Sequence, residues 1–350
     1  MKLDLKHIPL LASRNLWRSE CGPKSILGKN ETVIFIIIVI ISIFIGTANP
    51  AFWGISTVFN TARAMLIMLM FAMCEMLVII SGGIDVSFPA IATLAMYGTT
   101  LFMTKFGIDN IFFAFLMGVG IGILCGLLNA VLTTTFGIPA LIATLGTSSF
   151  LNGGMLTLLG SRELTVIPDS MERLYKMELL RRELPDGTVS TLTPLILIPV
   201  LLCILFYFML KYTMFGRAVY AVGGDPVAAK RVGFRVTAVK YKVYMLSGLI
   251  VGVTGIVYTI LMRLANATNL MGTEMMVIAA VVIGGVRITG GKGSVLGVVL
   301  GVLLINLVSN HLIMIGIPNY WQKFVIGVII VLGTAMTSIR DKRIANSPKI

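Results

Sequence analysis

The sequence KYTMFGRAVYAVGGDPVAAKRVGFRVTAVKYK (residues 211–242) is a polar, basic stretch in an otherwise apolar chain. It contains the start and stop signals of a short helix. Asp225 can accept the free amide hydrogens of a first turn, and Pro226 suits the first helical position. Two cations follow where they favour the negative end of the helix dipole, and Gly233 can end the helix in the left-handed conformation. The predicted helix consists of Pro226, Val227, Ala228, Ala229, Lys230, Arg231 and Val232.

A helix of about two turns is not stable alone in water, so this one needs a surface to dock against. Apolar stretches flank it on both sides. We therefore expect a helix that lies at the membrane surface and is presented to a soluble partner. The alternative is an ordinary basic loop between two membrane helices, which the charge alone would explain equally well. The paired caps favour the helix.

The composition is that of an integral membrane protein. Hydrophobic residues make up 57% of the chain and charged residues 12%, whereas a soluble domain carries about 25% charged residues. The net charge of +13 comes from lysines and arginines in short segments beside apolar stretches, which is a topology signal and argues against nucleic-acid binding. The cysteines form no CxxC pair and the histidines lie far apart in the sequence, so no metal site is predicted.

A membrane-spanning helix needs about 20 apolar residues, and that length predicts about ten spans. The eighth is the shortest, runs into a glycine pair, and can enter the membrane without crossing it. The predicted organisation is a basic N-terminal region (1–31), a membrane domain (32–338) and a C-terminal tail (339–350). The spans are expected at residues 32–48, 58–80, 86–104, 111–135, 140–159, 194–210, 243–262, 275–289, 294–311 and 320–338.

The distribution of lysine and arginine predicts the orientation, because these residues collect on the cytosolic side. With both termini inside, residues 211–242 are cytosolic. The loop at 160–193 is then extracytoplasmic, and its basic residues are balanced by acidic ones. An odd number of spans would place one basic terminus outside. The expected fold is therefore all-α, with about ten transmembrane helices and cytoplasmic N- and C-termini.

Two glycine-interrupted segments predict that the membrane domain is built from two pseudo-repeated halves. VIISGGI (78–84) resembles AVVIGGV (280–286), and an apolar stretch follows each. Such paired segments at matching places in two halves point to a transport pathway. The alternative is that the glycines allow close packing of helices. The candidate pathway residues from these segments are Gly82, Gly83, Gly284 and Gly285.

Polar residues inside the apolar stretches are further pathway candidates. Glu75 lies deep in the second predicted span, where a carboxylate is costly and marks a functional position or a buried pair. Asp85 follows the first glycine pair, but we favour a role for it as the cap of the third helix. Asn129 and Asn306 can bind sugar hydroxyls, although amides more commonly hold membrane helices together. No line of acids suited to a proton relay is present, which argues against a proton-driven carrier.

The stretch GVRITGGKG (285–293) does not meet the pattern of a nucleotide-binding P-loop. Val286 stands where the first glycine belongs, and Gly293 replaces the serine or threonine that holds magnesium. No soluble segment is long enough for a nucleotide-binding domain. If ATP drives this protein, a separate subunit binds it, and the chain itself needs no cofactor.

SGGIDVS (81–87) resembles the Gly-Gly-Ile-Asp-Leu-Ser signature of permease subunits in bacterial sugar ABC importers. These are the ribose, xylose and autoinducer-2 type systems, which are related to branched-chain amino acid permeases. The loop at 160–193 is longer and more charged than the family pattern, and residues 1–31 are unmatched. The similarity continues through ATLGT (143–147), FGR (215–217), AVGGD (221–225), IAAVVIGG (278–285) and GGKG (290–293).

The resemblance implies an ABC importer in the inner (cytoplasmic) membrane of a bacterial cell. The assembly would contain two permeases, either identical or paralogous, two cytosolic ABC ATPases, and an extracytoplasmic solute-binding protein facing the 160–193 loop. The cytosolic loop would carry the coupling helix, seated in a groove of the ATPase. The residues that match the family's coupling loop are Gly224, Asp225, Pro226, Val227, Ala228, Ala229, Lys230, Arg231 and Gly233.

We therefore expect a permease subunit, without an ATPase motif of its own, that moves a sugar or similar small polar solute inward. ATP hydrolysis on a separate subunit would drive it. The alternative is a self-sufficient secondary transporter. A membrane enzyme is a more distant alternative, because no acid, base and nucleophile are grouped in the sequence.

Overall fold

The computed structural model describes residues 30–183 and 189–318, together with Trp321, Phe324, Gly327, Val328 and Val331. Almost all of the predicted N-terminal region (1–31), most of the predicted tenth span (320–338) and the C-terminal tail (339–350) lie outside the described residues.

The described chain is mainly helical, which agrees with the predicted fold class. A π-helical turn, Val131–Thr135, extends the fourth helix. The α-helices are α1 (Asn30–Ala48), α2 (Ile55–Ile80), α3 (Phe88–Phe106), α4 (Ile111–Ala130), α5 (Ala140–Leu158), α6 (Asp169–Lys176), α7 (Leu197–Tyr212), α8 (Met214–Gly224), α9 (Pro226–Arg231), α10 (Val236–Met262), α11 (Glu274–Ile283) and α12 (Val295–His311), and the strands are β1 (Leu180–Glu183) and β2 (Val189–Leu192).

Seven helical stretches in the described part of the chain are long and apolar enough to cross a membrane. The predicted third span corresponds to α3, which has the length but is not among these seven. The predicted eighth corresponds to α11, which has only 10 residues. The seven stretches are Glu31–Ala48, Ile55–Ile80, Ile111–Thr135, Ala140–Leu158, Pro194–Tyr212, Val236–Met262 and Val295–Ile315.

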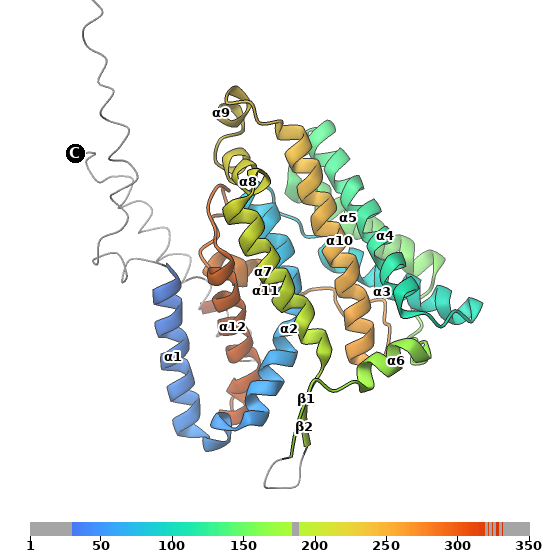
Figure 1. The fold of residues 1–350 in the computed structure, drawn as a ribbon, viewed down its shortest axis with the longest axis vertical. Helices are drawn as coiled ribbons and strands as arrows, with labels where there is room; N and C mark the ends of the chain where they lie inside the picture. The colour runs from blue at the N-terminus through green and yellow to red at the C-terminus, as the bar shows by residue number, and fades with distance from the viewer. Residues whose placement is uncertain are drawn as a thin grey trace, which may run out of the picture.

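The helix α10 lies at the centre of the bundle and packs against α4, α3 and α2 (Figure 1). Its backbone touches that of α4. A Cβ atom built on Gly122 would lie 2.1 Å from the carbonyl oxygen of Gly248, and one built on Gly252 would lie 2.1 Å from that of Gly118. Small residues at helical spacing allow this close approach of membrane helices.

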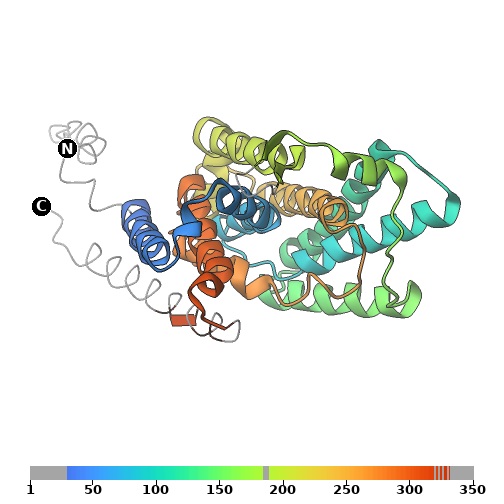
Figure 2. The same ribbon diagram turned by 90° about the horizontal axis from the view of Figure 1, so that it is seen from below.

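The helix α1 stands at the edge of the bundle, beside α12 (Figure 2). Many of its large apolar side chains are uncovered, as Phe35 (55% exposed) and Phe44 (61% exposed) illustrate. A continuous apolar face of this kind is stable only against another apolar medium. The position and the exposure of α1 therefore fit a helix that faces lipid.

The bundle has two ends of different character (Figure 1). The short helices α8 and α9 lie at one end, which we call the α9 end, and α6 and the β1–β2 hairpin lie at the other, the hairpin end. The strands pair antiparallel, with Leu180 opposite Leu192. This hairpin departs from the all-α prediction. Val189 and Thr191 on β2 are β-branched and suit a strand. The prediction of a loop over residues 160–193 does not use this signal.

Candidate functional site

The helix α9 forms where the sequence predicts it. Asp225 is the N-cap, and its Oδ1 atom accepts the amide hydrogens of Val227 at 2.8 Å and Ala228 at 3.0 Å. Pro226 occupies the first helical position. Gly233 follows the helix with φ of +95°, the left-handed conformation that favours glycine. The residues that cap the helix at both ends therefore all lie in the local sequence.

The exposed face of α9 is unusually apolar for a polar loop. Ala229 is buried against the rest of the chain (3% exposed). Val227 is 62% exposed and Val232 is 74% exposed, and Ala228 between them is exposed as well. The described chain covers α9 at Ala229, and the uncovered apolar residues stand beside the exposed Lys230 and Arg231.

A separate helix, α8, leads into α9, and the sequence reasoning missed it. Thr213 caps it by accepting the amide hydrogen of Gly216 at 3.1 Å. A Cβ atom on Gly216 would lie 2.5 Å from the Cα atom of Leu210, so glycine permits the tight fold between α7 and α8. Thr213 was a usable cap signal, but it follows an apolar span so closely that the chain reads as one helix ending in a loop.

The two glycine pairs end helices in the same way. After α2, Gly82 has φ of +87°, its amide donates to Ile79 O at 2.9 Å, and the amide of Gly83 donates to Val78 O at 3.1 Å. After α11, Gly285 has φ of +88°, and the amides of residues 285 and 286 make the equivalent bonds to residues 282 and 281. Both are Schellman caps.

This geometry corrects the alignment of the two halves by one residue. The sequence pairs Gly82 with Gly284, whereas the structure pairs Gly82 with Gly285 as the left-handed residue. Gly284 serves helix packing, because a Cβ atom on it would lie 2.7 Å from the carbonyl oxygen of Gly297 on α12. The glycine pairs therefore interrupt the backbone, and Gly284 also allows close packing; their place in a transport pathway stays a prediction.

The structure brings three of the polar pathway candidates together. Glu75, Asp85 and Asn129 are all buried. Glu75 Oε1 accepts the amide hydrogen of Asp85 at 3.2 Å, and Asp85 Oδ1 accepts from the amide and the hydroxyl of Ser87 at 2.8 and 2.6 Å. Asn129 Nδ2 donates to the hydroxyl oxygen of Ser87 at 2.7 Å. We call these four residues the polar cluster.

The polar cluster satisfies the irregular backbone between α2 and α3. Non-helical backbone at membrane depth is tolerated only where its polar groups find partners inside the protein. Asp85 does not cap α3 directly, because Ser87 is the N-cap and the helix begins at Phe88; it holds Ser87 instead. The fourth polar candidate, Asn306, belongs to α12 and makes no described hydrogen bond to the cluster. Its backbone carbonyl oxygen accepts from the side chain of Asn310.

Two oxygen atoms of the polar cluster remain without a hydrogen-bond partner among the described residues, Glu75 Oε2 and Asn129 Oδ1. The described ion pairs include neither Glu75 nor Asp85. Buried polar atoms of this kind are expensive, since each forfeits its bonds to water. The cluster therefore has two buried oxygen atoms with spare capacity for hydrogen bonds.

At the hairpin end the helix α6 is held by ion pairs. Asp109 accepts from the amide of Ser170 at 2.5 Å and from Arg173 at 2.7 Å. Hydrogen bonding from Ser170 above all, and the charge of Arg173, lower the pKa of the Asp109 carboxyl below its ordinary value. Glu172 contacts Lys176 at 3.1 Å and Arg263 at 3.0 Å, and its pKa is likewise lowered, chiefly by Lys176.

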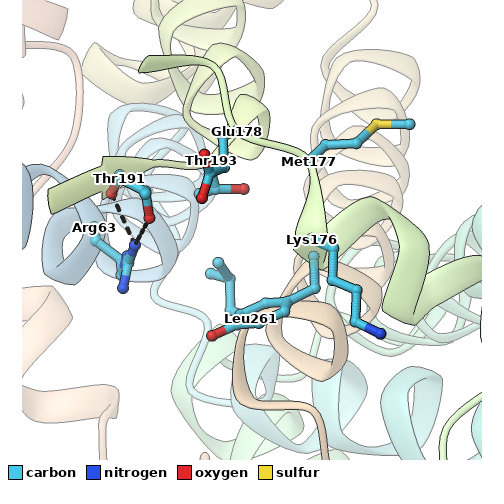
Figure 3. A pocket seen from close by; sticks show the side chains of 8 residues that line it. Arg63, Lys176, Met177, Glu178, Thr191, Thr193 and Leu261 are labelled. Carbon is cyan, nitrogen blue, oxygen red and sulfur yellow. Dashed lines mark hydrogen bonds between the residues drawn. The ribbon is translucent and has the colours of Figure 1, made fainter. Parts of the chain in front are cut away.

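A cavity of about 280 Å³ opens between α6, the hairpin and the ends of α2 and α10 (Figure 3). The Nη2 atom of Arg63 donates to the carbonyl oxygen of Thr191 at 2.9 Å. Among the described residues Arg63 has no acidic partner, whereas Lys176 forms an ion pair with Glu172 and Glu178 forms one with Arg181. The lining residues are Arg63, Tyr175, Lys176, Met177, Glu178, Thr191, Thr193 and Leu261.

Residues 57–333 match the protein family described as branched-chain amino acid transport system / permease component. The chain is 33% identical over 315 residues to the probable ABC transporter permease protein YphD of Escherichia coli (strain K12), covering 90% of this chain and 91% of that one. It is 31% identical over 303 residues to the ribose import permease protein RbsC of Bacillus subtilis (strain 168), with coverage of 87% and 90%.

The fructose import permease protein FrcC of Rhizobium meliloti is 31% identical over 264 residues, which cover 75% of this chain and 72% of that one. No solved structure matches the chain. The family match covers both glycine pairs, the polar cluster and α9. The chain therefore belongs to the family of branched-chain amino acid transport system permease components, and it is a multi-pass membrane subunit of the ABC transporter type.

Proposed function

We propose that this chain is the membrane-spanning permease of an ABC importer that brings a sugar or similar small polar solute into a bacterial cell. The related permeases named for ribose and fructose support the solute class. The exposed apolar residues at α9 are the observation that supports docking of a separate ATPase subunit there. A helix of 6 residues with Val227 and Ala228 uncovered on it and Val232 uncovered directly after it suits a groove on a soluble ATPase, which binds the ATP.

The charges of the two ends support an orientation with α9 in the cytoplasm. Acidic residues at the α9 end of the described chain are few, whereas those at the hairpin end nearly balance the basic ones. The positive-inside rule then places the hairpin end outside, facing a solute-binding protein across the inner membrane. The basic residues at the α9 end are Lys211, Arg217, Lys230, Arg231, Arg235, Lys240, Lys242, Arg287 and Lys292.

Two such permeases and two ATPases make the expected assembly. The polar cluster contributes to the solute pathway through the unpaired acceptors Glu75 Oε2 and Asn129 Oδ1, which fit sugar hydroxyls. At the outer end, the cavity beside Arg63 receives an acidic side chain of the solute-binding protein. The guanidinium of Arg63 is available for it, because this group has no carboxylate partner in the described chain.

The substitution Ala228→Glu tests the docking of α9. It places a charge on the exposed face, so we expect it to weaken co-purification of the ATPase by about tenfold or more, because an unpaired charge in an apolar interface is costly. The control is Ala238→Glu, which makes the same change at another exposed position of the α9 end. Quantitative mass spectrometry of the detergent-extracted complex measures the ratio. Equal ATPase content in both variants would argue against α9 as the docking element.

The substitution Arg63→Glu tests the outer cavity. We expect it to weaken binding of the solute-binding protein by about tenfold at low salt, with the difference shrinking at high salt, as for other interfacial charges. Lys105→Glu makes the same charge change at the end of α3, outside the cavity, and binds normally. Binding is measured on the complex in nanodiscs. A salt-independent loss, or the same loss in both variants, would exclude a carboxylate contact at Arg63.

A further inference from the structure

Gly223, near the end of α8, has backbone in direct contact with two other segments. A Cβ atom built on it would lie 1.7 Å from the carbonyl oxygen of Ile80, at the end of α2, and 2.9 Å from the amide nitrogen of Gly291. No side chain can occupy that space without moving the backbone around it. Gly223 precedes Asp225, the N-cap of α9, by two residues.

The segment after α11 closes the other side of this contact. Gly290 and Gly291 have φ of +87° and +75°. A Cβ atom on Gly290 would lie 2.5 Å from the carbonyl oxygen of Gly223 and 3.0 Å from the Cα atom of Gly82. The amide of Gly291 donates to Ile80 O at 2.9 Å. The segment after α11, in the second half, therefore supplies a hydrogen-bond donor to the last carbonyl group of α2, in the first half.

A hydrogen bond from α8 to the same segment adds to this contact. The hydroxyl of Tyr220 donates to the carbonyl oxygen of Gly293 at 2.8 Å. Residues 81–87, which include the first glycine pair, and residues 284–294, which begin with the second pair, thus both touch the residues that lead into α9. Contacts between backbones leave no flexible side chain to absorb a displacement, and close-packed groups pass strain to their neighbours.

We propose that Gly223 is the positioning residue through which displacement of α9 reaches both halves of the permease at once. Held between Ile80 and the Gly290-Gly291 pair, it moves the end of α2 and the segment before α12 together. The segment 81–87 is also tied to the polar cluster through Asp85 and Ser87, so the movement extends to the buried acceptors. This inference rests on the proposed docking of α9 to an ATPase.

Hydrogen–deuterium exchange on the assembled permease–ATPase complex tests the proposal without knowledge of the solute. The complex is compared nucleotide-free and trapped with ATP and vanadate. In the native protein, trapping shifts exchange in α9 and in both segments 81–87 and 284–294. In Gly223→Ala the shift persists in α9 but is lost from both segments. Gly120→Ala, at a position with no atom within 4 Å of an added Cβ, behaves as the native protein.

The outcomes separate this inference from the proposed function. If no ATPase assembles with the native protein, the docking proposal fails and this inference fails with it. If the native complex responds and Gly223→Ala shows the same shift in both segments, the inference alone is overturned. If Gly223→Ala does not assemble, Tyr220→Phe decides, since it removes the bond to Gly293 without adding volume. A reduced shift in 284–294 relative to α9 supports the proposal, and an unchanged one refutes it.

Discussion

Glu75 shows how one buried carboxylate can maintain an irregular backbone inside a membrane protein. Its Oε1 atom accepts the amide hydrogen of Asp85, a backbone group that no helix or strand would satisfy. Asp85 and Asn129 then hold Ser87 from two sides. The sequence identifies each of these residues as polar and deep, but their partners come from α2, α4 and the segment between α2 and α3. Their common role therefore depends on tertiary structure.

The substitution Glu75→Leu should destabilise the protein by about 1–3 kcal/mol, the cost of leaving a buried amide without an acceptor. Glu75→Gln keeps an oxygen of similar reach and should lose less. Thermal unfolding of the purified protein in detergent, followed by circular dichroism, compares the two. A Leu variant as stable as the Gln variant would show that the bond to Asp85 contributes nothing to stability.

The helix pair α4 and α10 depends on glycines that bring their backbones into contact. Gly122→Ala would place a methyl group 2.1 Å from the carbonyl oxygen of Gly248, so the helices must move apart. We expect a loss of about 1–3 kcal/mol, as for other overpacked interiors. Gly120→Ala on the same helix meets no atom within 4 Å and serves as the control. Equal unfolding temperatures of the two variants would contradict the packing described here.

Elements that carry their own signals were the ones the sequence predicted well. The caps Asp225 and Gly233 lie within ten residues of each other, and α9 forms between them. The long spans α2 and α10 follow from apolar length alone. By contrast, α8 was missed because Thr213 directly follows α7. The sequence pairs Gly82 with Gly284 instead of Gly285, an error of one residue, because the left-handed conformation is determined by where each helix ends.

At the scale of the whole molecule, the two halves meet beside α9. The glycine pairs are predicted from the sequence to mark a pathway; the structure places Gly82 of the first pair, and Gly290 and Gly291 shortly after the second pair, next to the residues that lead into the docking helix. Sequence similarity between the halves does not contain this information, because Gly223 lies in the loop between the two matched segments. The polar cluster, Gly223 and α9 together connect the buried acceptors to the α9 end of the molecule.

Affinity purification of the tagged chain from its native membranes in mild detergent decides whether a separate ATPase drives this permease. All co-purifying chains are identified and quantified. We expect an ABC ATPase with its own P-loop in stoichiometric amount, bound to the permease through α9. Purification without any ATPase, together with solute uptake in vesicles driven by an ion gradient alone, would identify a secondary transporter instead.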